Sequence, residues 1–182
     1  MRWLRLFLLF VLIPLAGCAI NGQSYWVDTA GPYQLNTGDV VRVTVYGDKD
    51  LTNTYKIDDA GAISFPLVGP IHVAGATTES AAKRLSAALA NGFMRNPNVA
   101  MEVAEYRPFF IQGEVTTSGQ FPYVYGMTVR AAISTAGGFK DTADRSRVTI
   151  FRRNGDRMMK TKVGLDFPIQ PGDTVVVAER WL

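Results

Sequence analysis

Apolar and polar residues alternate in short stretches along most of this chain, and turn signals separate the stretches. In residues 39–46, valines alternate with Arg42 and Thr44, and a Gly-Asp pair lies at each end. Such alternation predicts a strand with one face toward a core. The pattern also predicts a hairpin of 55–57 with 62–65 around a turn at 58–61, and strands at 71–73 and 99–103.

A helical period interrupts these strands after Thr77. Threonine is a residue type that caps the first turn of a helix, and Asn91-Gly92 is a typical helix end. The apolar residues between them recur at helical spacing and predict one buried stripe. This stripe consists of Ala81, Leu85, Ala88 and Leu89.

A second set of elements follows Pro108. Asn154-Gly155 is a strong signal for a two-residue hairpin turn, and Gly137-Gly138 is a helix end. The chain is therefore predicted to form two successive units of α+β type. The second unit is expected to contain strands at 109–111 and 120–124, a helix capped by Thr128, a hairpin of 148–152 with 157–162, and a last strand at 173–177.

Two short patterns occur once in each half of the chain. Gly38-Asp39 precedes a valine-rich strand, as does Gly172-Asp173, and a Gly-x-Thr sequence precedes each helix. Two related units would explain this echo. The use of common turn and cap residues explains it as well, and we favour this second explanation because the spacing is irregular.

The N-terminus is typical of an exported protein. Arg2 and Arg5 precede an apolar run at 6–16, which is shorter than the roughly 20 residues that a membrane-spanning helix needs. The run ends in Leu-Ala-Gly-Cys18, which resembles a bacterial lipobox. We therefore expect a signal peptide over 1–17, acylation of Cys18, and a tether over 18–32. An ordinary signal peptide with a chance cysteine is the alternative.

Composition narrows the possible functions. Loss of the two signal-peptide arginines lowers the formal charge from +3 to +1, so the pI of about 9.1 overstates the basicity of the mature protein. No Lys/Arg cluster is longer than Arg152-Arg153, and we expect no nucleic-acid partner. Cys18 is the single cysteine, so folding must depend on core packing and not on disulfides.

No arrangement of residues typical of catalysis appears. The chain has one histidine, His72, and no nucleophile elbow, P-loop or zinc-protease motif. Asp48, Asp50 and Asn53 suggest a metal site, but they lack the glycine and distal glutamate of a calcium loop and are better interpreted as turn residues. We expect no metal, no cofactor and no enzymatic activity, although distant carboxylates can pair in ways that a sequence does not reveal.

Several segments, taken in order, resemble a known bacterial family. Residues 33–47 (YQLNTGDVVRVTVYG), 59–69 (DAGAISFPLVG), 73–77 (VAGAT) and 96–99 (NPNV) are similar to the polysaccharide export domain. Residues 110–115 (FIQGEV), Gly119, 126–128 (GMT) and 136–139 (AGGF) are similar to the soluble-ligand-binding β-grasp (SLBB) module that follows it. The resemblance implies an α+β fold, with an export domain at 33–106 and an SLBB-like module at 107–182.

The resemblance also implies a function. Family members are outer-membrane lipoproteins that face the periplasm, form homo-oligomeric rings and pass capsular polysaccharide or exopolysaccharide together with an inner-membrane co-polymerase. Long members add a C-terminal helix that crosses the outer membrane, whereas this sequence ends in Glu-Arg-Trp-Leu182 directly after a strand. A short member would need a separate outer-membrane pore component. Two alternatives are a non-transporting glycan-binding or co-polymerase scaffold lipoprotein, and a carbohydrate-active enzyme.

Aromatic residues are the candidates for contacts with sugar or with neighbouring subunits. Tyr46, Tyr106, Tyr123 and Tyr125 offer large rings at low entropic cost and can stack on sugar rings or line a subunit contact. Core packing is the alternative role for each. Because a translocon must release its cargo, we expect a diffuse polar lining without a deep pocket.

Overall fold

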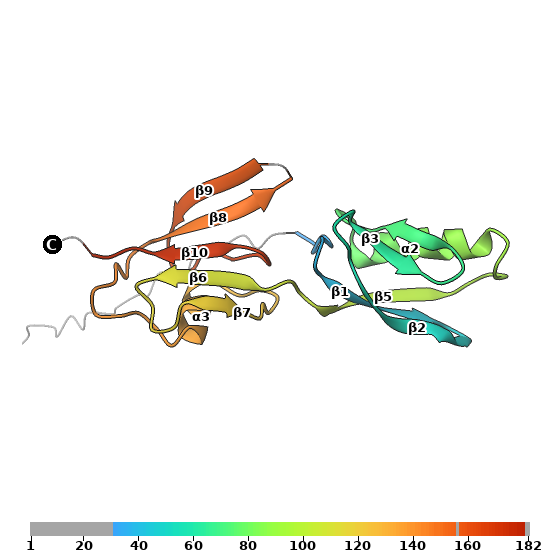
Figure 1. Ribbon diagram of the computed structural model, residues 1–182, viewed down its shortest axis with the longest axis horizontal. Helices are drawn as coiled ribbons and strands as arrows, with labels where there is room; N and C mark the ends of the chain where they lie inside the picture. Colours follow the sequence, from blue (N-terminus) through green and yellow to red (C-terminus); the bar gives the residue numbers. More distant parts are fainter. Residues whose placement is uncertain (1–30, 156, 181–182) are drawn as a thin grey trace, which may run out of the picture.

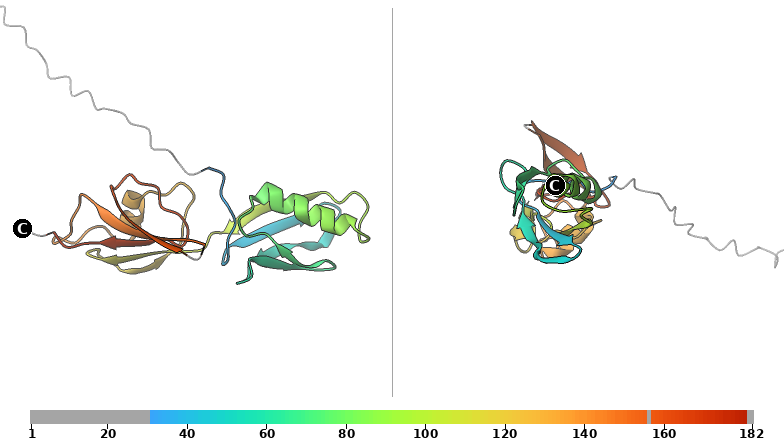
Figure 2. Two further views of the ribbon diagram at one scale, coloured as in Figure 1. Left: turned by 90° about the horizontal axis from the view of Figure 1, so that it is seen from above. Right: turned by 90° about the vertical axis from the view of Figure 1, so that its right-hand side faces the viewer.

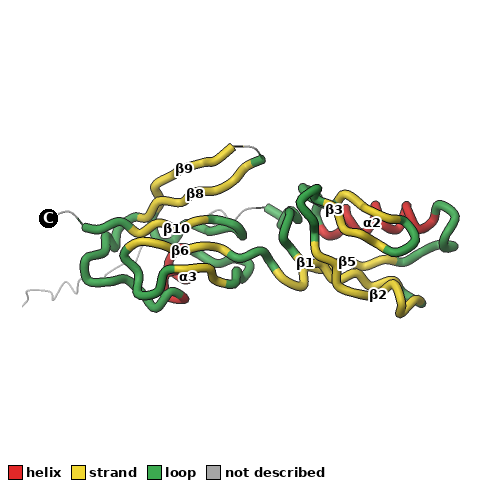
Figure 3. Tube along the Cα trace, in the orientation of Figure 1, coloured by secondary structure: helices red, strands yellow, loops and turns green. Residues whose placement is uncertain are grey.

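The computed structural model describes residues 31–155 and 157–180, which form two α+β units placed end to end (Figure 1). The predicted signal peptide, Cys18 and most of the predicted tether lie outside the described residues. Each unit has its own apolar core. The described part contains two helices, one in each unit, and the remaining regular structure consists of strands (Figure 3). The predicted α+β class is confirmed.

The first unit is a three-stranded sheet with a helix and a hairpin on one face. The valines at 41, 43 and 45 are fully or almost fully buried, while Arg42 points to solvent, as the alternation predicts. The sheet has the order β2-β1-β5 and is antiparallel. Its elements are β1 (Val40–Val45), β2 (Asp48–Lys56), β5 (Val99–Glu105), the hairpin β3 (Ala62–Phe65) and β4 (Gly69–His72), and α2 (Thr78–Ala90).

Helix α2 begins where the sequence predicts. The Thr77 hydroxyl accepts a hydrogen bond from the Ser80 amide at 3.2 Å. The buried residues of the helix are Ala81, Ala82, Leu85 and Leu89, whereas the predicted Ala88 is only partly buried. In this first unit, the predicted pairing of 55–57 with 62–65 is wrong. Residues 55–56 instead belong to β2 and pair with β1, and β3 pairs with β4 across a turn at 66–68.

The second unit is a five-stranded sheet with the order β7-β6-β10-β8-β9 and one helix. The central strands β6 and β10 are parallel and the other neighbours are antiparallel, which is the β-grasp arrangement that the resemblance implies. In Figure 2, α3 lies on one side of this sheet. The elements are β6 (Phe109–Gly113), β7 (Gly119–Phe121), α3 (Val129–Thr135), β8 (Val148–Asn154), β9 (Arg157–Val163) and β10 (Thr174–Val177).

The parallel pair depends on a glycine at the end of β6. Gly113 has φ of +95°, and a methyl group there would lie 2.0 Å from the carbonyl oxygen of Val177. Gly113→Ala is therefore expected to lower the free energy of unfolding by about 2–4 kcal/mol, through backbone strain and a clash with β10. Chemical denaturation measures this loss. Gly164→Ala is the control because that glycine is exposed and has open space around it; an equal loss in both variants would contradict the explanation.

Neither helix in the described part of the chain is long and apolar enough to cross a membrane.

Candidate functional site at the junction of the two units

A charged and aromatic cluster lies where the two units meet. Residues 106–108 connect β5 to β6, and Arg107 in this connection contacts both units. Its backbone amide donates to Asp39 Oδ1 at 3.0 Å, and its guanidinium lies 3.3 Å from Asp39 Oδ2. A methyl group at Gly172 would come within 3.0 Å of Arg107 Nε, so the same side chain also packs on the second unit.

Asp39 is fully buried, and its carboxylate is satisfied by several donors. The Tyr33 hydroxyl donates to Oδ2 at 2.6 Å, the Asn36 amide donates to Oδ2 at 2.9 Å, and Arg107 donates to both oxygens. Burial raises the pKa of the Tyr33 phenol, and the hydrogen bond to Asp39 and the negative charge of Asp39 raise it further. A buried carboxylate requires such partners because an unpaired one is costly.

Asp173 in the second unit has the same local structure. Its backbone amide donates to the carbonyl three residues earlier at 3.1 Å, as that of Asp39 does, and both aspartates follow a glycine with positive φ. Arg152 donates to both of its oxygens, at 2.8 and 2.7 Å, and the Gln170 amide donates at 2.7 Å. The repeated Gly-Asp pattern therefore marks a shared turn that leads into the central strands β1 and β10.

Three of the four predicted tyrosines belong to the junction. The ring of Tyr106 contacts Tyr33 at 4.9 Å between centroids, Tyr123 at 5.5 Å and Tyr125 at 6.5 Å, the last in a stacked arrangement. Tyr46 is separate, in the turn between β1 and β2.

Exposure separates these tyrosines into two groups. Tyr46 and Tyr125 are 60% and 56% exposed, whereas Tyr123 is 8% exposed and donates its hydroxyl to the Ile169 carbonyl. Tyr123 therefore has the alternative role of core packing, because its ring lies in the core of the second unit. Tyr125 can offer a ring face to a ligand, and Tyr106, partly buried behind it, supports that ring.

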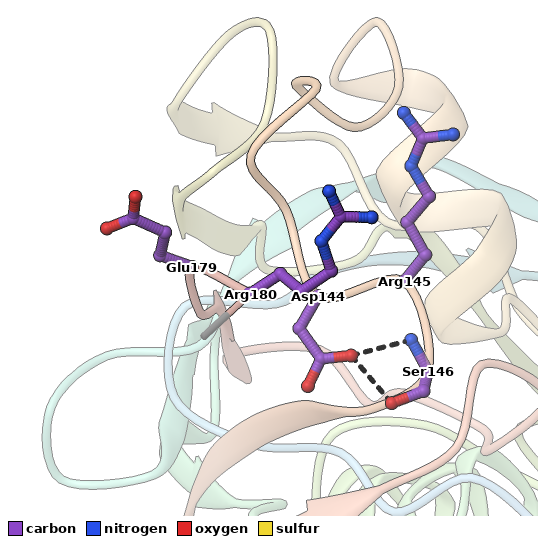
Figure 4. A pocket seen from close by; sticks show the side chains of 5 residues that line it. All are labelled: Asp144, Arg145, Ser146, Glu179 and Arg180. Atoms are coloured by element: carbon purple, nitrogen blue, oxygen red, sulfur yellow. Dashed lines mark hydrogen bonds between the residues drawn. The ribbon is translucent and has the colours of Figure 1, made fainter. Parts of the chain in front are cut away.

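Open hollows lie elsewhere on the described surface. One lies at the far end of the second unit and is lined by Asp144, Arg145, Ser146, Glu179 and Arg180 (Figure 4). Asp144 Oδ1 accepts from the side chain and amide of Ser146, and these hydrogen bonds lower the pKa of its carboxyl. In Figure 4 both arginines point away from this carboxylate. Another hollow, between α2 and residues 96–99, is equally shallow.

The geometry of the site suits binding and positioning. The described residues contain no group of three or more His, Cys, Asp or Glu side chains that could hold a metal ion. The His72 ring lies within hydrogen-bond distance of the Ala60 carbonyl, 3.1 Å away, which is a structural role. Asp48 accepts hydrogen bonds from the amides of residues 50 and 51, as a turn residue does.

Sequence reasoning missed the charged half of the junction. Asp39, Arg107, Asp173 and Arg152 are the residues it did not identify. The signal available was the Gly-Asp pair before each central strand, because an aspartate adjacent to a valine-rich, half-buried strand is a candidate for burial and then needs a cation.

Alkaline pH is expected to destabilise the protein through Tyr33. The pKa of Tyr33 is higher in the folded protein than in the unfolded chain, so the folded state retains a proton that the unfolded state loses above about pH 10. The contribution of Tyr33 to the free energy of unfolding is therefore fully present below about pH 10 and decreases as the pH rises further. Denaturation midpoints measured between pH 8 and pH 11 would show the fall.

Tyr33→Phe isolates this contribution. The variant loses a hydrogen bond to a charged group, so we expect a loss of about 1.5–3 kcal/mol at neutral pH together with a weaker alkaline dependence. Tyr46→Phe is the control, since its exposed side chain has no hydrogen-bond partner among the described residues. An unchanged alkaline slope in Tyr33→Phe would contradict the assignment.

Comparison with protein families gives two matches in sequence order. Residues 27–104 match the family "Polysaccharide biosynthesis/export protein", and residues 108–162 match the SLBB domain. The described parts of these matches coincide with most of the first and second units. The junction cluster therefore lies between and at the edges of two matched domains.

Curated relatives agree with these matches. The chain is 31% identical over 138 residues to the exopolysaccharide production protein ExoF of Rhizobium meliloti, covering 69% of this chain and 32% of that protein. It is 31% identical over 185 residues to the EPS I polysaccharide export outer membrane protein EpsA of Ralstonia nicotianae, covering 83% of this chain and 48% of the relative. The polysialic acid transport protein KpsD of Escherichia coli is 26% identical, covering 81% and 28%. The chain thus spans between about a quarter and a half of the length of these relatives.

Proposed function

Because this chain belongs to the family of polysaccharide biosynthesis/export proteins and has an SLBB domain after its export domain, we propose that it is a component of a polysaccharide export machine of the bacterial envelope. In this role it guides capsular polysaccharide or exopolysaccharide across the periplasm toward the cell surface. The role is transport without catalysis.

The order of the two domains is the observation that carries this proposal. The relatives named for export or production of polysaccharide align with more than two thirds of this chain, across both domains. The chain spans less than half of each of these relatives. The sequence match therefore does not show the activity of a complete export machine, which we propose.

We place the protein at the outer membrane, attached through lipid on Cys18 and facing the periplasm. Two relatives are named outer membrane proteins, which supports this membrane. Cys18 follows Leu-Ala-Gly, and Ala19 stands where an aspartate would resemble an inner-membrane retention signal in enteric bacteria. Several acyl chains on one cysteine hold a protein stably on a membrane, whereas a single chain does not.

We propose a homo-oligomeric ring as the working assembly, with an inner-membrane co-polymerase as its partner. A closed head-to-tail ring surrounds a chain-like cargo with repeated copies of one subunit. The Asp39–Arg107 contact supports this assembly because its charged hydrogen bonds hold the connection between the two units against the first unit, and the same arginine packs beside Gly172 of the second. Tyr46 and Tyr125, with Tyr106 behind the latter, are the aromatic candidates for contacts with sugar or with a neighbouring subunit.

Deletion of the gene in its own host tests the proposed function. We expect polymer to disappear from the cell surface and to accumulate in the periplasm, and a plasmid copy to restore export. Normal surface polymer in the deletion strain would contradict the transport role.

Cross-linking of the purified lipidated protein should give large discrete homo-oligomers, and strict monomers at high concentration would contradict the ring.

A further inference from the structure

The five-stranded sheet of the second unit has a face that no helix in the described chain covers. Phe109, Ile111 and Val175 point into the core beside α3, so the residues between them lie on the opposite face. Figure 2 shows α3 on one side of the sheet alone. We call this surface the open face; it comprises Phe110, Thr174, Phe151, Lys160, Arg153 and Lys162.

The open face has an aromatic row across the sheet. Phe110 pairs with Thr174, Thr174 pairs with Phe151, and Phe151 pairs with Lys160, so these side chains are neighbours on adjacent strands. Phe110 is 41% exposed, and the Lys160 ammonium lies 5.5 Å from the centroid of the Phe151 ring. Adjacent strands lie about 4.8 Å apart, so the five strands span roughly 20 Å.

Positive charge is concentrated on the same face. The five strands contain no aspartate or glutamate, and Arg153, Lys160 and Lys162 are exposed on the β8–β9 hairpin, where the turn sequence holds one acid, Asp156. Among the described residues these three cations form no ion pair, although Asp144 exerts an attraction on Lys162. The three-stranded sheet of the first unit, in contrast, contains four acids: Asp48, Asp50, Glu102 and Glu105.

We infer that the open face binds an acidic polysaccharide, in which uronic-acid carboxylates contact the three cations and sugar rings lie on Phe110 and Phe151. The inference rests on the proposed export function and adds the charge of the cargo. Charge complementarity carries it, since exposed cations that form no ion pair among the described residues attract a polyanion. An anionic membrane surface is less suitable. The hairpin turn has the polar sequence Asn154-Gly155, and the exposed Met158 and Met159 beside it are successive strand residues, so they point to opposite faces and form no single apolar surface.

Binding of defined polymers to the full-length protein in mild detergent tests this inference. Polygalacturonate serves as the acidic polymer, and carboxyl-reduced polygalacturonate and dextran serve as neutral ones. Lys160→Gln/Lys162→Gln is expected to weaken polygalacturonate binding about tenfold, because each cation that contacts the polyanion adds to the affinity. Phe110→Thr is expected to weaken it about threefold, because the variant loses the aromatic ring on which a sugar would lie. Raising the salt to about 1 M, where the Debye length is near 3 Å, should abolish binding.

Lys49→Gln/Lys56→Gln is the matched control, since it removes the same charge from exposed positions on β2. Unchanged circular dichroism and thermal unfolding show that each variant is folded. Equal weakening in both double variants, or equal binding of the carboxyl-reduced polymer, would overturn the inference. Binding to phosphatidylglycerol vesicles that depends on Lys160 and Lys162, without polygalacturonate binding, would overturn it in favour of a membrane contact. The gene deletion tests the export function separately. If the cargo were a neutral polysaccharide, the deletion would still block export, whereas this inference would be wrong.

Discussion

Replacing Arg152 by methionine is expected to lower the free energy of unfolding by about 3–5 kcal/mol, the largest stability loss for a single substitution outside the apolar core. Asp173 is fully buried, and Arg152 provides the charge that compensates it through two hydrogen bonds. Methionine keeps much of the apolar stem but leaves the carboxylate with the Gln170 amide as its remaining donor. Removal of one partner of a buried ion pair typically has this cost.

Arg130→Met is a matched control for this measurement. Arg130 also donates through Nε and Nη2 to an aspartate, Asp166, but 59% of its side chain and 43% of that of Asp166 are exposed. Exposed pairs contribute up to about 1 kcal/mol. Urea denaturation of both variants compares a buried with an exposed pair in which the same two guanidinium nitrogens donate to an aspartate. The double variant Arg152→Met/Asp173→Asn should recover part of the loss, and equal losses for Arg152→Met and Arg130→Met would show that burial is not the cause.

The local pattern of apolar and polar residues was sufficient to predict the strands and the helix that bury one face. The valines of β1 and the hairpin of β8 with β9 are encoded within a few residues and lie where the sequence predicts them, although Asn154 still pairs with Arg157 in the hairpin. In α2, three of the four predicted stripe residues are buried. The family resemblance was needed for the parallel pairing of β6 with β10, because the two strands lie about 60 residues apart and no local period reports which strands become neighbours.

Strand β2 shows why one hairpin was predicted wrongly. Leu51 is the one buried residue among its nine, so most of this edge strand has no apolar alternation to detect. The turn at 58–61 does form, with the Asp58 amide donating to the Ala62 carbonyl. It leads the chain away from the sheet into a second hairpin, however, and so does not pair the segments on either side of it. A turn signal identifies a change of direction and not the partner strand.

The junction could be predicted only in part. The tyrosines were identified because aromatic residues are conspicuous in a sequence, and three of the four do meet. Asp39 and Asp173 looked like ordinary turn acids, since the cations that compensate them are 68 and 21 residues away. Pairing over such distances is a property of the folded chain, and the short Gly-Asp pattern was the one trace of it in the sequence.

Replacing Cys18 by alanine is expected to abolish lipidation completely. The chain has one cysteine, so no other thiol can accept the lipid, and cleavage of a lipobox-type signal requires the acylated residue. Neither helix in the described residues is long and apolar enough to hold the protein in a membrane in place of the acyl chains. Labelling with a fatty-acid analogue should detect wild type alone, and the variant should retain its uncleaved signal or appear in the soluble fraction. Surface polymer should fall toward the level of the deletion strain.

Ala19→Asp is the control for this variant, because it changes the neighbouring residue and leaves the acylated cysteine in place. We expect it to be labelled as strongly as wild type and, in an enteric host, to move from the outer to the inner membrane fraction. Comparison of the two variants separates the presence of a lipid from the membrane that the lipid selects. Equal labelling of Cys18→Ala and wild type would refute the lipid anchor, and wild-type protein in the inner-membrane fraction would refute the proposed location while leaving the anchor intact.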